Sequence, residues 1–134
     1  MTKPTAKELN EITSKIIGAA IPIHKTFGPG LLERAYNACL CQGLMRAHLK
    51  VERQKPLPLM YHSVRIDCAY RADIVVEEKV LIEVKAVEAS NPTFRRQVYT
   101  YLRLGDYRVG LLLNFGAPTM LEGIERIVND FPDE

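Results

Sequence analysis

Two short apolar stretches separated by a polar break limit what this chain can fold into. In residues 72–76 and 80–86, apolar side chains recur at every second position, which is the period of a half-buried β-strand. The three polar residues between them, 77–79, suit the connection of a tight hairpin. A turn at this break places Ile74 opposite Ile82. The pattern therefore predicts an antiparallel hairpin whose apolar face packs on a core.

The other face of this predicted hairpin carries charged side chains. The same register places Asp73 opposite Glu83, and Lys85 follows on the same face because side chains alternate along a strand. Two opposed carboxylates destabilise a sheet, whereas a hard divalent cation such as Mg²⁺ prefers oxygen ligands of this kind. The alternative is a surface hairpin with solvated acids and a salt bridge between Glu83 and Lys85.

Two helices are expected before the hairpin. Thr5 and Glu8 have the spacing of a capping box, which begins a helix with an apolar stripe that continues to Ile23. A glycine- and proline-rich turn at 27–30 follows. A second helix is expected over residues 31–48.

Three short strands are expected between the second helix and the hairpin, at residues 51–54, 57–61 and 64–67. Pro56 and Pro58 cannot donate backbone hydrogen bonds, so they favour a position at the edge of a sheet.

A strand–helix–strand unit should follow the hairpin. Asn91 and Pro92 begin a helix, as an N-cap and a proline at the first helical position, and Gly105 should end it. The apolar run at 108–115 is typical of a strand buried on both faces and parallel to the strand at 80–86. Residues 124–128 form either a last strand or a turn of helix. The expected fold class is α/β, with a mixed sheet flanked by helices.

Three motifs occur together in this chain. They are Gly30-Leu31-Leu32-Glu33-Arg34-Ala35-Tyr36, the hairpin Tyr70-Arg71-Ala72-Asp73 with Ile82-Glu83-Val84-Lys85-Ala86, and Gln97-Val98-Tyr99-Thr100-Tyr101. This ordered set resembles the PD-(D/E)XK nuclease superfamily and, more closely, the small bacterial GxxExxY proteins within it. The resemblance covers about residues 16–128. It implies a restriction-endonuclease-like core in the order α-β-β-β-α-β, within a single domain of residues 1–134.

The resemblance also implies an activity and a set of site residues. The implied activity is hydrolysis of phosphodiester bonds in DNA, with RNA as a second candidate, and it requires Mg²⁺ or Mn²⁺. The implied metal ligands are Asp73, Glu83 and the carbonyl of Val84. The implied catalytic residues are Asp73, Glu83, Lys85, Glu33 and Gln97, and the residues implied to contact the substrate are Tyr101, Arg71 and Arg95.

Several of these residues also have a structural explanation. Glu33 falls in the first turn of a helix, where the helix dipole favours a negative charge. Gln97 and Tyr101 share one helix face and could be a surface amide and a packed ring. The chief alternative function is a catalytically silent module that binds nucleic acid or another protein. The net charge of only +2 favours that alternative, and the intact acids and lysine favour the enzyme.

Composition narrows the remaining classes. The chain has 134 residues, a size suited to one domain, and it has no apolar stretch long enough for a transmembrane helix and no apolar signal core. Cys39, Cys41 and Cys68 lack the spacing of a zinc site and are expected to be reduced thiols of a cytoplasmic protein. A domain this small has little surface for duplex recognition, so we expect a homodimer or a partner protein.

Overall fold

A five-stranded mixed β-sheet forms the centre of the computed structural model, which describes residues 3–67 and 70–133. The strand order is β1-β4-β5-β6-β7, with β5 and β6 parallel and the other neighbours antiparallel. These strands are β1 Val51–Pro56, β4 Arg71–Val76, β5 Val80–Lys85, β6 Val109–Asn114 and β7 Ile124–Val128. The predicted parallel pair and the predicted edge position beside Pro56 are both confirmed.

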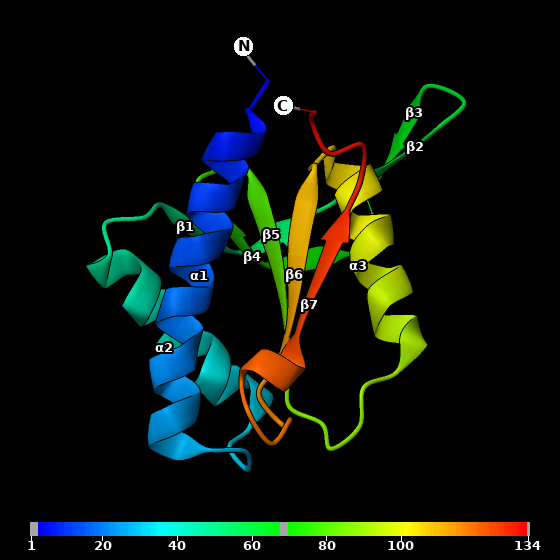
Figure 1. The fold of residues 1–134 in the computed structure, drawn as a ribbon. Helices are drawn as coiled ribbons and strands as arrows, with labels where there is room; N and C mark the ends of the chain where they lie inside the picture. Colours follow the sequence, from blue (N-terminus) through cyan, green and yellow to red (C-terminus); the bar gives the residue numbers. More distant parts are fainter. Residues whose placement is uncertain (1–2, 68–69, 134) are drawn as a thin grey trace.

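Helices cover both faces of this sheet (Figure 1). Helices α1 (Ala6–Phe27) and α2 (Glu33–Arg46) pack together on one face, and α3 (Pro92–Gly105) lies on the other. The predicted α/β class, a restriction-endonuclease-like mixed sheet flanked by helices, is confirmed. Within the described part of the chain, no helix is long and apolar enough to cross a membrane.

Strands β2 (Leu59–Tyr61) and β3 (Val64–Ile66) form a separate two-stranded ribbon that projects away from the main sheet (Figure 1). His62 and Ser63 close the ribbon with φ angles of 49° and 61°, as a two-residue hairpin turn requires. The two strands predicted here are confirmed, but each is shorter than expected. Cys68, which follows the ribbon, lies outside the described residues.

The predicted start signals of two helices are confirmed by their hydrogen bonds. The Thr5 hydroxyl accepts a hydrogen bond from the Glu8 backbone N–H at 3.1 Å and begins α1. The Asn91 side chain accepts one from the Thr93 backbone N–H at 2.8 Å and begins α3. Each bond satisfies a backbone donor that has no partner inside its own helix.

Helix α2 is shorter than the expected range of 31–48. Gly30 has a φ angle of 128°, which only glycine adopts readily, so the chain before Leu32 is not helical. At the other end, His48 has a φ angle of 63° and turns the chain out of the helix. The start at residue 33 leaves Glu33 in the first turn of α2.

Helix α3 ends one residue later than expected. Gly105 is its last helical residue, and Asp106 adopts the left-handed cap conformation with a φ angle of 57°. A Cβ atom at position 105 would lie 2.2 Å from a ring carbon of Tyr107. The glycine is therefore required by the close approach of a ring and not by the cap.

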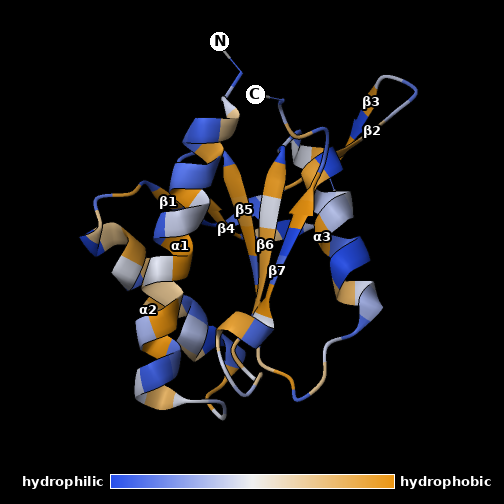
Figure 2. Ribbon diagram, in the orientation of Figure 1, coloured by the Kyte–Doolittle hydropathy of each residue, from blue (hydrophilic) through white to orange (hydrophobic). Residues whose placement is uncertain are grey.

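Strands β4 and β5 are buried on both faces, so the prediction of half-buried strands is wrong. Ile74 and Ile82 pack with α1 and α2, whereas Val75 and Leu81 pack on the opposite side with α3. Figure 2 shows predominantly hydrophobic residues along β5. Burial of such a side chain contributes roughly 1.5–3 kcal/mol. The hairpin is thus the centre of the sheet, and any charged side chain on it is placed in a largely apolar environment.

Candidate active site

Asp73 and Glu83 lie side by side where β4 and β5 stop pairing. The paired residues run from Val76–Val80 to Ile74–Ile82, which confirms the register predicted from the turn. Asp73 and Glu83 follow directly after this last pair. The backbone N–H of Val84 then donates a hydrogen bond to Oδ2 of Asp73 at 3.0 Å. The Val84 N–H thus bonds to a side-chain carboxylate of β4, where regular pairing would supply a backbone carbonyl.

The pairing on the other side of Asp73 is also interrupted. The β1–β4 register pairs Arg53 with Ile74 and Lys55 with Ala72, and it passes over Gln54 and Asp73. Gln54 has a φ angle of 52°, which is uncommon for a residue other than glycine. Its Nε2 donates a hydrogen bond to Oδ1 of Asp73 at 3.4 Å. Both oxygens of the Asp73 carboxylate therefore accept a hydrogen bond.

This interruption changes the direction of side chains along β4. Regular alternation would place Ala72 on the same face as Ile74, as the sequence suggested. Instead, Ala72 packs in the cluster beside α3 together with Val75, which is three positions away. The expected apolar face is therefore wrong at Ala72, because β4 departs from regular alternation at Asp73.

Glu83 is a buried carboxyl with an unsatisfied oxygen. Glu83 is only 5% exposed, and within the described residues its Oε2 atom has no hydrogen-bond partner. Burial, followed by the hydrogen bond and the charge of Asp73, raises the pKa of Glu83 to about 9, against an opposing effect of Lys85. The interpretation of the pair as solvated surface acids is wrong, because Glu83 is buried.

Lys85 ends β5 and is held in place from two directions. Its Nζ atom lies 4.5 Å from the centre of the Phe94 ring on α3, in cation–π geometry. Its carbonyl accepts a hydrogen bond from the Phe115 backbone N–H at 2.8 Å. The Asn114 side chain then holds the next turn of chain, with hydrogen bonds of 3.0 Å to both the N–H and the C=O of Val87.

Sequence reasoning missed both Gln54 and Asn114. Gln54 is a polar residue on an edge strand, and nothing in its sequence neighbourhood indicates a positive φ angle. Asn114 is the polar residue at the end of an apolar run that forms a buried strand. A buried amide requires hydrogen-bond partners. An asparagine at the end of a buried strand could therefore have indicated a contact with the backbone nearby.

Glu33 approaches the acid pair from α2. It is an exposed residue, yet partial burial raises the pKa of its carboxyl; Lys85 lowers that pKa and Asp73 raises it. Those two electrostatic effects place Glu33 within range of the hairpin residues. The structure thus gathers Glu33, Asp73, Glu83 and Lys85 in one region.

Tyr36 positions the loop before Glu33. Its hydroxyl donates to the carbonyl of Gly28 and accepts from the Leu31 N–H at 3.1 Å. Its ring is fully buried and stacks on Phe115 at a centroid distance of 4.5 Å. Tyr36 is therefore a packed core residue whose hydroxyl fixes the loop before α2.

Gln97 and Tyr101 lie on the face of α3 that looks toward the hairpin. The Gln97 amide donates a hydrogen bond to the Tyr101 hydroxyl at 2.9 Å. Burial raises the pKa of Tyr101, the Gln97 bond opposes that effect, and the charges of Glu83 and Asp73 add to it. Tyr101 is only 7% exposed, so it is a packed ring close to the acids.

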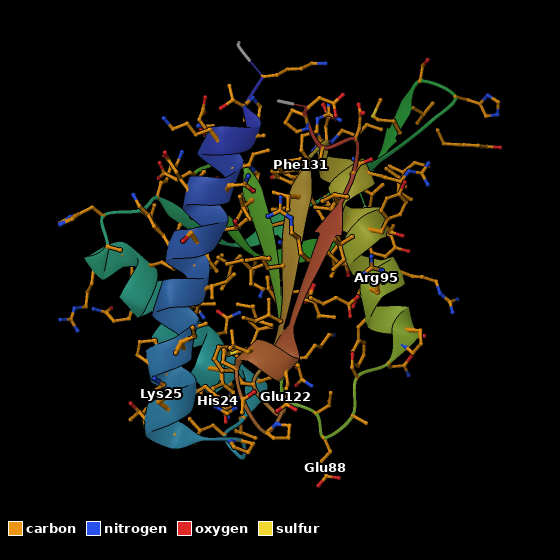
Figure 3. The ribbon with its side chains drawn as sticks, in the orientation of Figure 1. His24, Lys25, Glu88, Arg95, Glu122 and Phe131 are labelled. Atoms are coloured by element: carbon orange, nitrogen blue, oxygen red, sulfur yellow. The ribbon has the colours of Figure 1, made fainter. Side chains whose placement is uncertain are left out.

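The two arginines expected to contact substrate have different surroundings. Arg71 begins β4, is exposed, and donates to the carbonyl of Gln54 at 3.4 Å, so it lies beside the acid pair. Arg95 forms an ion pair with Glu125 on β7, toward the opposite edge of the sheet (Figure 3). Arg95 is therefore not grouped with the other site residues.

The oxygen donors at the hairpin suit a hard divalent cation. Two carboxylates and a backbone carbonyl are the ligand types that Mg²⁺ accepts, with water and substrate oxygens completing its shell. The Oε2 atom of Glu83, which has no hydrogen-bond partner among the described residues, is an oxygen ligand that such a cation would use. Among residues 3–67 and 70–133, no group of three or more His, Cys, Asp or Glu side chains could hold a metal ion. A site here would thus depend on the backbone and on water as well as on side chains.

Comparison with known families found a match over most of the chain. A family model described as the PD-(D/E)XK nuclease superfamily matches residues 10–127, which include all the site residues expected from the sequence. Comparisons with curated proteins and with solved structures found no match.

Proposed function

Because the chain belongs to the PD-(D/E)XK nuclease superfamily, we propose that it is a divalent-metal-dependent nuclease. The proposed substrate is DNA, with RNA as the second candidate. The observation that carries the proposal is the buried Glu83 carboxyl, whose Oε2 has no hydrogen-bond partner within the described residues, next to the Asp73 carboxylate. The motif formed by Gly30, Glu33 and Tyr36 supports placement among the GxxExxY proteins of that superfamily.

Asp73, Glu83 and the carbonyl of Val84 would hold Mg²⁺ or Mn²⁺. When bound, the cation supplies Lewis-acid activation of water and offsets negative charge on the phosphate. The buried Glu83 carboxyl would give up its proton in favour of the cation, and its unsatisfied oxygen would gain a partner. The bonds that Asp73 accepts from Val84 and Gln54 fix the orientation of its carboxylate before the cation arrives.

The remaining residues would act on water and on the phosphate. The Lys85 ammonium, held against Phe94, would orient the attacking water and stabilise the charge that develops on the phosphate. Glu33 would accept a proton from that water, because its raised pKa brings it closer to neutral pH. Gln97, fixed by its bond to Tyr101, would orient groups at the mouth of the site.

The proposal is tested by incubating the purified protein with single- and double-stranded DNA and RNA in Mg²⁺, in Mn²⁺ and in chelator. Metal-dependent cleavage is expected, and Asp73→Asn, Glu83→Gln and Lys85→Ala should each abolish it. Asp106→Asn is the matched control, because it also converts an acid to its amide but lies at the cap of α3. If the wild type binds nucleic acid and cuts none of it with either metal, the silent binding module replaces the enzyme.

A further inference from the structure

We propose that Tyr70 is a stacking site for an unpaired nucleobase, and that the substrate is therefore single-stranded nucleic acid or an unpaired end. This inference rests on the proposed nuclease function, since it names the substrate class of the same site.

The Tyr70 ring is partly exposed to solvent, and contacts on one side hold it in place. Tyr70 precedes β4 by one residue, and it is 43% exposed. Its carbonyl accepts a hydrogen bond from the Leu57 N–H at 2.9 Å, which ties its backbone to the end of β1. Its ring meets the buried Tyr101 ring at a centroid distance of 6.1 Å and an interplanar angle of 61°. One part of the ring is therefore packed, and the rest is available to a ligand.

The ring is close to the proposed chemistry. Tyr101 contacts Tyr70, accepts a hydrogen bond from the Gln97 amide through its hydroxyl, and is near enough to Asp73 and Glu83 for their charges to raise its pKa. Tyr70 also stands three positions before Asp73 in the chain. A nucleotide held at Tyr70 would thus lie next to the phosphate that the acids act on.

The chemistry of this surface suits a base and its phosphate. Aromatic rings hold single strands by stacking, with little dependence on sequence, because every base has a π-face. A ring that is already oriented loses little conformational freedom when it stacks. The exposed guanidinium of Arg71 is adjacent in the chain and can contact a backbone phosphate. Tyr70 and Arg71 together therefore supply the two contacts typical of single-strand binding.

A continuous duplex fits these observations less well. Its bases are stacked on one another, so a side-chain ring at the rim of the site has no free π-face to meet. Duplex binding also relies on many cationic contacts to phosphates, and the net charge of the chain is only +2. An unpaired base has a free π-face for the ring, and a single strand requires fewer cationic contacts than a duplex.

The chain offers a matched control for this proposal. Tyr99 is also 43% exposed, but it lies on α3 with Arg103 over its ring at 6.0 Å, in a groove lined by residues of α3 and β7. Removal of its side chain takes away the same chemical group from a place distant from the proposed base site.

The test measures binding in chelator, where no cleavage occurs, by fluorescence polarisation of labelled twelve-nucleotide probes. The probes are oligothymidylate, its RNA counterpart, a duplex, and a single strand of abasic residues. Tyr70→Ala should weaken binding of both base-containing single strands by at least about fivefold. Tyr70→Phe should bind like the wild type, Tyr70→Leu should bind like Tyr70→Ala, and Tyr99→Ala should have no effect. The abasic strand should bind all these proteins equally.

The outcomes separate this inference from the proposed function. Stacking is overturned if wild-type protein does not bind the single strands, if Tyr70→Leu restores binding, if Tyr99→Ala is as weak as Tyr70→Ala, or if the abasic strand responds in the same way. It is also overturned if the duplex binds more tightly than the single strands. If binding depends on Tyr70 but Mg²⁺ and Mn²⁺ support no cleavage, the nuclease function fails and the base site stands.

Discussion

The side-chain amide of Gln54 donates a hydrogen bond to the Asp73 carboxylate at 3.4 Å, across a register that leaves these two opposed residues unpaired among the β1–β4 pairs described. The φ angle of 52° at Gln54 carries a conformational cost of about 1–2 kcal/mol for a residue with a Cβ atom. Such strain persists when the surrounding structure determines it, and it is concentrated at functional sites. Here it accompanies the departure of β4 from regular alternation at Asp73.

Gln54→Gly separates the strain at this position from the contact. Glycine accepts the φ angle without cost, so the metal-free protein should be as stable as the wild type or more stable by up to about 1 kcal/mol. The lost hydrogen bond should leave Asp73 less well oriented, and Mn²⁺ affinity and cleavage should each fall about fivefold. Calorimetric titration with Mn²⁺ and a cleavage assay measure the two effects.

Asp106→Gly is the control for Gln54→Gly. Asp106 has a φ angle of 57° in the cap of α3, so this variant should gain stability without loss of metal affinity or cleavage. Equal metal affinity in Gln54→Gly and wild type would mean that Gln54 does not orient Asp73 for the metal.

The buried acid predicts how stability depends on pH. The folded-state pKa of Glu83 is raised to about 9 from an ordinary value of 4.5. Between these values the folded protein keeps a proton that the unfolded chain has released, so the free energy of unfolding should fall as pH rises through this window. The slope due to one group is at most about 1.4 kcal/mol per pH unit. Urea unfolding in chelator from pH 6 to 9 measures it.

Glu83→Gln is the control for this pH dependence, because an amide has no proton to lose in the window. The unfolding free energy of Glu83→Gln should therefore fall less steeply with pH than that of the wild type. The difference between the two slopes is the contribution of the Glu83 carboxyl. Parallel pH profiles of the two proteins would mean that Glu83 is ionised in the folded state.

Metal binding should stabilise the wild type through the same pair of acids. A ligand bound only by the folded state adds about 2.7 kcal/mol at a concentration of 100 Kd. Saturating Mn²⁺ should therefore raise the wild-type Tm by several degrees, and it should do little for Asp73→Asn. Without metal, Asp73→Asn should stay within about 1 kcal/mol of the wild type near neutral pH, because Glu83 is protonated and the Asn side-chain oxygen can still accept from Val84. A large loss of metal-free stability would identify Asp73 as a structural residue.

The repulsion expected from the sequence is therefore limited to high pH. Alternation and turn position predicted that Asp73 and Glu83 would be neighbours, and they are neighbours. The alternation within the hairpin could not show that α3 would bury the charged face of β5, since that depends on packing between distant segments. Burial by α3 keeps Glu83 protonated and removes the repulsion that solvated acids would have.

Local signals predicted local structure, and tertiary contacts determined the rest. The caps at Thr5 and Asn91 form within three residues, so their spacing in the sequence was sufficient. The Asn114 contact joins residues 27 positions apart, and Gln54 reaches a carboxylate 19 positions away. Neither contact has a sequence period that could reveal it. Both residues lie beside the proposed catalytic groups, where regular pairing gives way to side-chain contacts.

Asn114→Ala tests whether the chain after Lys85 must be held for Lys85 to act. The substitution leaves the N–H and C=O of Val87 without their side-chain partner, and it should cost about 2–3 kcal/mol of stability. Because these bonds fix the backbone just beyond Lys85, turnover should also fall about tenfold or more below the melting temperature, with little change in KM. Urea unfolding and steady-state cleavage measure the two effects.

Asn129→Ala is the matched control for Asn114→Ala. Its side chain also donates to a backbone carbonyl at 3.0 Å, that of Tyr107, but it follows β7 at a distance from the acids. It should lose stability and keep its turnover. A positioning role for Asn114 requires that only Asn114→Ala lowers turnover, and that Asn114→Ala has no further effect when Lys85→Ala is already present. If both asparagine variants lower turnover in proportion to their loss of stability, Asn114 supports the fold and not Lys85.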